Sequence, residues 1–143
     1  EMHQHEHPPS AFEVSGFTYT MNGSVLGRTT EQKYLGVMLT SDLRWDTHIS
    51  NMVAKANRSI GLVKRSLHMC KQDVKSLAYV SLVRSHLDYA SCAWDPFTDC
   101  NIKKLESVQH KAGRFVSRNY NWDESGASII EDLGWKTLEQ RRN

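Results

Sequence analysis

Lysine and arginine side chains recur at helical spacing in two separate segments of this chain. They belong to the sets Lys55, Arg58 and Arg65, and Lys103, Lys104, Lys111, Arg114 and Arg118. On a helical wheel, each set lies opposite an apolar stripe. Cations of this kind suit contacts to phosphate groups, which give affinity for a polyanion without reading a base sequence. The alternative is that they are solvated helix faces that only keep the chain soluble.

The distribution of charge favours the polyanion. The chain has 143 residues and a net charge of +2. Residues 1–52 carry a balance of −3, residues 53–118 carry +7, and the remaining residues carry −2. A basic middle segment between acidic flanks suggests a polyanionic partner.

Cysteine and histidine offer little for metal binding. The three cysteines, an odd number without a CxxC pair, argue against a disulfide framework and for an intracellular, reducing compartment. No zinc-ligand spacing is present, and Cys92 is expected to be a small core residue. His3, His5 and His7 alternate in residues 1–11, a segment with two prolines that we interpret as a flexible terminal segment rather than a metal site.

Carboxylates offer no clear catalytic pair either. Asp88 and Asp95 flank aromatic residues, but each equally suits the end of a helix or a turn. Glycine-rich phosphate loops and nucleophile elbows are absent from the sequence. We therefore expect no catalytic residue, no metal site and no cofactor within this chain.

Residues 12–45 read as a small antiparallel β-element of two or three strands. Alternating residues between Phe12 and Leu26 surround Asn22-Gly23, a strong signal for a two-residue hairpin turn. A further strand is predicted over Lys33–Leu39, with Gly36 inside it marking a bulge or a close backbone approach.

Residues 46–143 read as a bundle of three to four helices, which makes the fold class α+β and mostly α. The first helix begins at Asp46 or Thr47, either of which suits an N-cap. The second, over Gln72–Ala90, is apolar around its whole circumference and is expected to be a buried spine that includes Leu82. A third follows over 101–119, and a short last helix ends at Gly134. Met52, Ile60, Trp94 and Phe115 are expected in the core. The longest apolar runs are too short to cross a membrane.

Four blocks of this sequence resemble a known family. They are KYLGVMLTSDLRWDTHI, LVRSHLDYASCAWDP, LESVQHKAGRFV and LGWKTLEQRR, in that order. Together they are similar to the carboxyl-terminal part of the reverse transcriptases (RNA-directed DNA polymerases) of LINE-type, non-LTR retrotransposons, and most of all to the jockey-like mobile elements. The resemblance covers residues 12–142, nearly the whole chain.

The resemblance implies a position within such an enzyme. Tyr34, Leu35 and Gly36 match the triplet at the end of the palm, next to the primer-holding hairpin, and residues 46–143 match the thumb domain. Ser41–Asp46 would then be the joint between palm and thumb, with Trp45 seating the first thumb helix. The implied partners are an RNA–DNA or other template–primer duplex and the remainder of the palm. The implied compartments are the cytoplasm and the nucleus.

The polymerase chemistry itself is missing from this sequence. Nucleotidyl transfer needs carboxylates that hold two metal ions, and the family takes them from an Asp-Asp pair and an earlier palm strand. The sequence has no adjacent Asp-Asp, so the Mg²⁺ site of the parent enzyme is not expected here. Two alternatives stay open, namely a helical protein-interaction module and a non-functional remnant of a decayed element.

Overall fold

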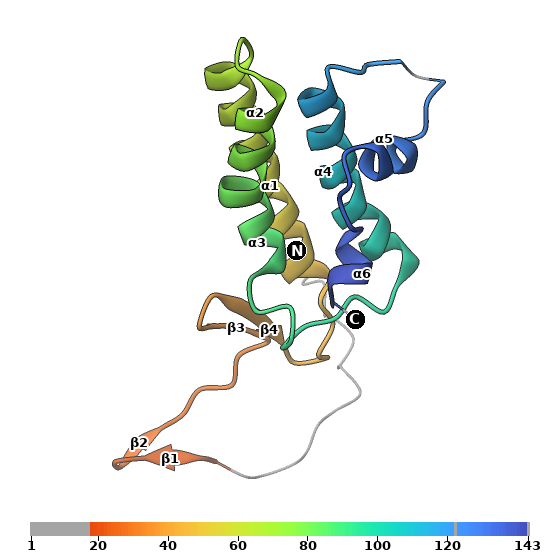
Figure 1. Ribbon diagram of the computed structural model, residues 1–143. Helices are drawn as coiled ribbons and strands as arrows, with labels where there is room; N and C mark the ends of the chain where they lie inside the picture. The colour runs from red at the N-terminus through yellow and green to blue at the C-terminus, as the bar shows by residue number, and fades with distance from the viewer. Residues whose placement is uncertain (1–17, 122, 143) are drawn as a thin grey trace, which may run out of the picture.

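The computed structural model describes residues 18–121 and 123–142, and it confirms an α+β fold that is mostly helical (Figure 1). His3, His5, His7, the strand signal before residue 18 and Trp122 lie outside the described residues. The elements are β1 (Thr20–Met21), β2 (Ser24–Val25), β3 (Glu31–Tyr34), β4 (Val37–Thr40), α1 (Asp46–Leu67), α2 (Gln72–Tyr79), the π-helical turn η1 (Val80–Arg84), α3 (Ser85–Asp88), α4 (Asp99–Ser117), α5 (Gly126–Asp132) and α6 (Leu138–Arg142).

The β-element consists of two separate hairpins. β1 pairs with β2 through the predicted Asn22-Gly23 turn, whose φ angles of 50° and 78° fit the left-handed geometry that such turns need. β3 pairs with β4 through Leu35-Gly36, with φ angles of 45° and 84°. The prediction of one continuous strand over 33–39 is therefore wrong, whereas the close backbone approach that it offered for Gly36 is confirmed by the ring of Tyr89. Positive φ at two successive residues reverses the chain, so Gly36 lies in a tight turn between two strands.

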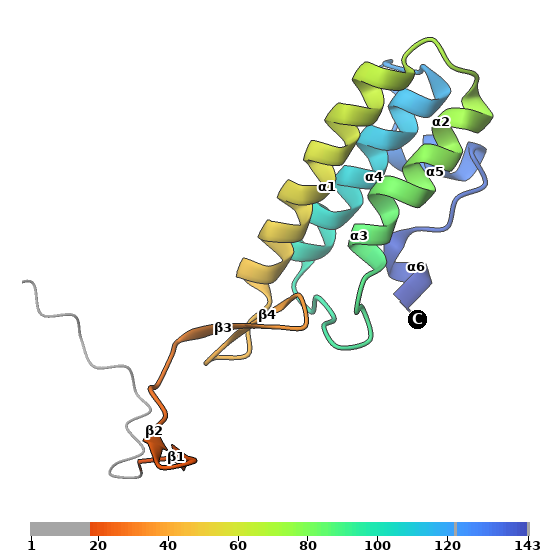
Figure 2. The same cartoon turned by 90° about the vertical axis from the view of Figure 1, so that its left-hand side faces the viewer.

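The second hairpin packs on the helices, whereas the first stands apart from them. β4 lies against α1, and Val37 is buried in the core. Residues 18–36 are all exposed, and β1 and β2 lie well away from the helical body in both views (Figures 1 and 2).

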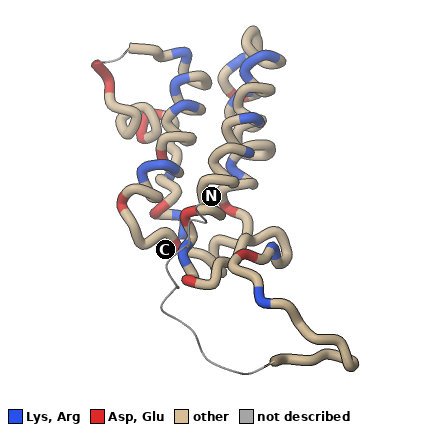
Figure 3. The backbone as a smooth tube through the Cα atoms, turned by 180° about the vertical axis from the view of Figure 1, so that it is seen from behind, with Lys and Arg blue, Asp and Glu red and all other residues tan. Residues whose placement is uncertain are grey.

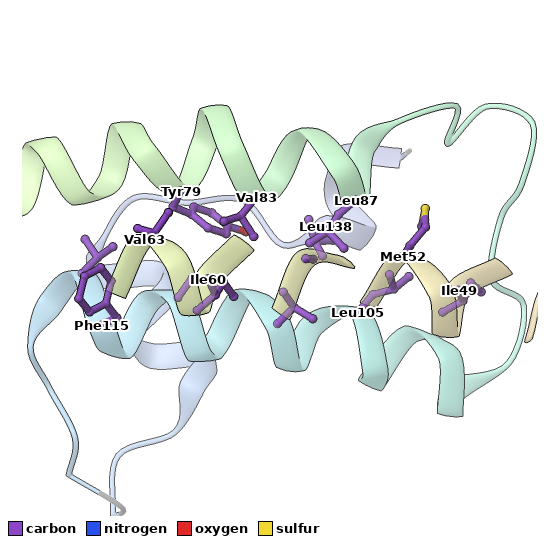
Figure 4. Packing of buried hydrophobic residues seen from close by; sticks show 14 of the residues in the cluster. Ile49, Met52, Ile60, Val63, Tyr79, Val83, Leu87, Leu105, Phe115 and Leu138 are labelled. Carbon is purple, nitrogen blue, oxygen red and sulfur yellow. The ribbon is translucent and has the colours of Figure 1, made fainter. Parts of the chain in front are cut away.

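The helices enclose one hydrophobic core, which lies between α1, α4 and the segment from α2 to α3. α1 and α4 pack side by side, α2 and α3 pack against α1, and α5 packs against α4 (Figure 2). Side chains from all these elements except α5 meet in one cluster, with Leu138 of α6 in contact (Figure 4). The four predicted core residues, Met52, Ile60, Trp94 and Phe115, are all buried.

The segment from α2 to α3 is not a helix buried all round, as the sequence suggested. Its buried residues are Lys75, Tyr79, Val83 and Leu87, each four positions after the last. An α-helix has 3.6 residues per turn, so positions four apart drift around it. The π-turn η1 widens the helix in the middle and keeps these residues on one side. The other side, with Val74, Leu77 and Leu82, is exposed.

The start of α1 is fixed by tertiary contacts rather than by a side-chain cap. Trp45 is the residue before the helix, so the prediction of Asp46 or Thr47 as the N-cap is wrong. The Asp46 carboxylate instead accepts a hydrogen bond of 2.9 Å from the amide of Asn101, which ties the first turns of α1 and α4 together. Trp45 is half-buried against the core, and its ring lies edge-on to that of His48.

The carboxyl-terminal elements close the bundle. Ser125 caps α5 by accepting from the Ser128 N–H, and Gly134, at φ 66°, follows the end of the helix as predicted. The guanidinium of Arg141 in α6 donates to the Asp88 carboxylate over 2.9 Å, which joins α6 to α3.

Cys92 is exposed, so its assignment to the core is wrong; it lies in the loop after α3, where the neighbouring Trp94 takes the core position. Among the described residues, no helix is long and apolar enough to cross a bilayer.

Candidate nucleic-acid interface

A groove of about 670 Å³ lies between the β3–β4 turn, α1 and α3. Three cations from two elements line it, namely Lys33 of β3 and Lys55 and Arg58 of α1, and no Asp or Glu is among its lining residues. Its apolar lining includes Leu35, Met38 and Met52. The groove thus combines a positive lining with apolar surface.

Tyr89 fixes the β3–β4 turn against the end of α3. Its phenol donates a hydrogen bond of 2.9 Å to the Leu35 carbonyl, across more than fifty residues of sequence. The same ring lies so close to Gly36 that a β-carbon there would be 3.2 Å from ring atom Cε1. Gly36 is therefore required twice, for its positive φ and for this close approach.

His48 holds the second strand of the hairpin on α1. Its Nδ1 accepts a hydrogen bond of 3.2 Å from the Met38 N–H, which places the ring proton on Nε2. Nε2 is buried and has no hydrogen-bond partner among the described residues. The ring packs edge-on against Trp94, with 5.3 Å between centroids. Burial lowers the pKa of His48, so the imidazole is kept neutral.

His86 adds a titratable group to the groove. Burial lowers its pKa, and the nearby positive charge of Lys55 lowers it further. The second effect reports a positive potential in the groove, because a cation disfavours a second charge of the same sign.

The structure brings part of the predicted site together. Lys55, Arg58, Leu35 and Gly36 all line the groove, although they come from two elements. Tyr34 is exposed but is not among the lining residues. Of the other predicted cations, the exposed Arg65 on α1, the exposed Lys103 and Lys111 on α4 and the half-buried Lys104 lie elsewhere on the two long helices.

Two of the α4 cations, Lys104 and Lys111, lie away from α5. Figure 3 shows Lys and Arg positions recurring along the long helices. Gly113 packs on α5, with Ile130 Cδ1 only 2.9 Å from where a β-carbon would be. Helical spacing places Lys104 and Lys111 on the opposite side of α4 from Gly113. These two side chains are therefore accessible to a partner that approaches from that side.

Two predicted binding residues have structural contacts. Arg114 donates to the carbonyls of Asn121 and Glu124, each over 2.7 Å, and so holds the loop before α5. Arg118 donates to the carbonyls of His68 and Cys70, each over 3.4 Å, and so ties the end of α4 to the loop before α2. Binding of a polyanion by either guanidinium would compete with these contacts.

The sequence reasoning missed Lys33, His48, His86 and Lys75. The first three line one groove because β4 and α3 both pack against α1, a tertiary arrangement that the sequence pattern does not show. Lys75 is a buried residue of α2, with Nζ 4.7 Å from the centre of the Phe115 ring. Burial, and then the charge of Arg118, lower its pKa, while Cys70 opposes the shift. The signal available was the four-residue spacing of Lys75, Tyr79, Val83 and Leu87.

No group of three or more potential metal ligands occurs among the residues that the structure describes. Comparisons with protein-family models, with curated proteins and with solved structures find no match for this chain.

Proposed function

We propose that this chain grips a template–primer duplex, as the palm edge and thumb of a non-LTR retrotransposon reverse transcriptase do. It would act through phosphate contacts, and the catalytic carboxylates and their Mg²⁺ would come from the remainder of the palm. The four sequence blocks that resemble this family support the proposal.

The observation that carries the proposal is the groove. Lys33, Lys55 and Arg58 line one concave surface with no carboxylate among the lining residues, although the chain as a whole has nearly as many acids as bases. Among the described residues, Lys55 and Arg58 form no ion pair. Their charges are therefore available to phosphates, and each phosphate that is neutralised releases condensed counterions.

The test is a fluorescence-anisotropy titration with a labelled RNA–DNA hybrid, at low and at near-physiological salt. We expect binding that weakens steeply with salt. The variant Lys55→Glu/Arg58→Glu should bind more weakly, and the slope of log K against log salt should become shallower by about 0.9 for each phosphate that the variant no longer neutralises.

The matched control is Lys71→Glu/Lys136→Glu, which changes the net charge equally at two exposed positions outside the groove. It should retain more affinity than the groove variant. Equal losses of affinity in the two variants would mean that only net charge matters, and an absence of hybrid binding at low salt would refute the proposal.

A second candidate function rests on the exposed side of α2 and η1. Val74, Leu77 and Leu82 are exposed there, which favours contact with another protein helix. Light scattering over a range of concentrations would detect self-association, and Leu77→Ser/Leu82→Ser should abolish it. A monomer at all concentrations would remove self-association from consideration.

A further inference from the structure

We propose that the groove holds an unpaired nucleotide of the bound nucleic acid, with its base on the apolar lining and its phosphate on Lys55 and Arg58. The inference rests on the proposed function in taking a nucleic acid as the ligand. It adds that the groove receives a single-stranded end next to the duplex that the chain grips.

The lining of the groove carries the argument. Phosphate contacts alone would need only the cations, yet Leu35, Met38, Met52 and the ring of Tyr89 also line it. The phosphates of a duplex lie on its convex outer surface and would reach the cations while the apolar surface stayed in water. An unpaired base has a free face that can stack on an aromatic ring. The volume also falls within the range of small-ligand sites, about 300–1,000 Å³.

Tyr89 is suited to such stacking. The residue is 54% exposed, yet its hydroxyl is held by the Leu35 carbonyl and its ring edge lies close to Gly36. A base would therefore meet a ring that is already fixed, and little side-chain freedom would be lost on binding.

The conformation of Leu35 also supports a nucleotide site in the groove. It has a φ of 45°, a left-handed conformation that leucine rarely adopts, and the residue is 74% exposed. Asparagine or glycine would suit this turn position better. An exposed, strained leucine beside a cation-lined groove is readily explained by an apolar ligand surface, such as the face of a base.

The experiment compares three labelled ligands at one salt concentration: a blunt RNA–DNA hybrid, the same hybrid with a short unpaired overhang, and the overhang sequence as a free single strand. We expect the overhang to tighten binding of the hybrid about tenfold. A fluorescent adenine analogue in the overhang should be quenched on binding, since quenching reports stacking.

Two variants test the named residues. Tyr89→Leu keeps apolar bulk and removes the ring, and it should abolish both the quenching and the tighter binding. Leu35→Asn suits the turn geometry and removes the apolar side chain, so it should reduce the advantage of the overhang even if Tyr89→Leu unfolds the hairpin. The matched control is Tyr120→Leu, an exposed tyrosine outside the groove, which should change neither quantity.

The outcomes separate this inference from the proposed function. If the blunt hybrid binds in a salt-dependent way and the overhang adds nothing, the nucleotide site is refuted and the duplex grip stands. If only the single strand binds, the nucleotide site stands and the duplex grip falls. If no nucleic acid binds, both fall, and binding of a glutamate-rich peptide would then assign the groove to an acidic protein segment.

Discussion

At the scale of single residues, His48 makes the stability of the fold depend on pH. Its pKa in the folded chain is lowered by burial, so the unfolded chain takes up the proton more readily. Stability is then fully present above the unfolded pKa of about 6.5 and is lost as pH falls below it. Protonation would also remove the Nδ1 lone pair that accepts from Met38.

We therefore expect the urea concentration at the midpoint of unfolding to decrease as the pH is lowered from about 8 to about 5. His48→Gln keeps an acceptor for the Met38 N–H without titrating, so its midpoint should fall less over the same range. His86→Gln is the control for the exposed side of the groove, because that histidine also has a lowered pKa. An identical pH dependence in wild type and His48→Gln would mean that His48 is not the group responsible.

Adjacent residues of the π-turn should differ sharply in their tolerance of charge. Val83 is fully buried and Leu82 is 52% exposed. Val83→Asp places a carboxylate in the core and should cost several kcal/mol, whereas Leu82→Asp should cost less than about 1 kcal/mol. Denaturant unfolding monitored by circular dichroism measures both. A greater loss of stability in Leu82→Asp would restore the buried spine that the apolar pattern suggested.

At the scale of elements, two helical glycines should respond to alanine with opposite signs. On α1, a β-carbon at Gly61 would meet only the end of the Arg65 side chain, at 3.6 Å. Gly61→Ala should therefore stabilise the protein by about 0.5–1 kcal/mol, because alanine loses less backbone entropy in a helix. On α4, a β-carbon at Gly113 would lie 2.9 Å from Ile130 Cδ1 and 3.3 Å from Ile129 Cγ2. There the overpacking should outweigh the propensity gain and destabilise by about 1–3 kcal/mol.

Relative to wild type, the melting temperature should rise in Gly61→Ala and fall in Gly113→Ala. Parallel shifts would mean that α5 yields to the added methyl group and does not pack tightly on α4.

The elements differ in how well their boundaries and burial could be predicted from the sequence. The Asn22-Gly23 turn and the stop at Gly134 were predictable, because both depend on local glycine geometry. The apolar stripe of α1 was predictable because its period matches an ordinary helix. The burial pattern of α2 to α3 was not, since the π-turn changes the period within one helix. The Leu35-Gly36 turn was missed because leucine at positive φ contradicts the usual residue preference.

At the scale of the whole molecule, the candidate site could be predicted only in part, because local sequence patterns do not show which distant segments come together. The sequence identified Lys55 and Arg58 as cations on an exposed helix face. It could not show that Lys33 and His86 join them, because that depends on the packing of α3 against α1 and on the Tyr89–Leu35 hydrogen bond between distant segments. Nor could it show that Arg114 and Arg118 hold loops, since helical periodicity gives direction but not partners. Of the predicted basic face of α4, Lys103, Lys104 and Lys111 have no such loop contact within the described part of the chain, while the binding role of all five cations stays a prediction.

The whole molecule also divides into a packed body and an arm. The arm is the part of the described chain before β3, residues 18–30, and it contributes nothing to the described core. The earliest buried residue among those described is Val37, and every described residue before it is exposed. Arg28 is the first lysine or arginine in the sequence and lies exposed between the two hairpins. Trypsin should therefore cut first after Arg28, while the cations of α1 and α4 are protected by helical structure. Mass spectrometry would identify a product that begins at Thr29.

That product should unfold at the temperature of the intact chain, to within about 2 °C, because cleavage leaves the described core intact. It should also bind the RNA–DNA hybrid with unchanged salt dependence, since Lys33, Lys55 and Arg58 all follow the cut. A markedly lower melting temperature would show that the first hairpin supports the body. A weakened affinity with an unchanged melting temperature would instead place part of the nucleic-acid interface within residues 1–28, which include β1 and β2.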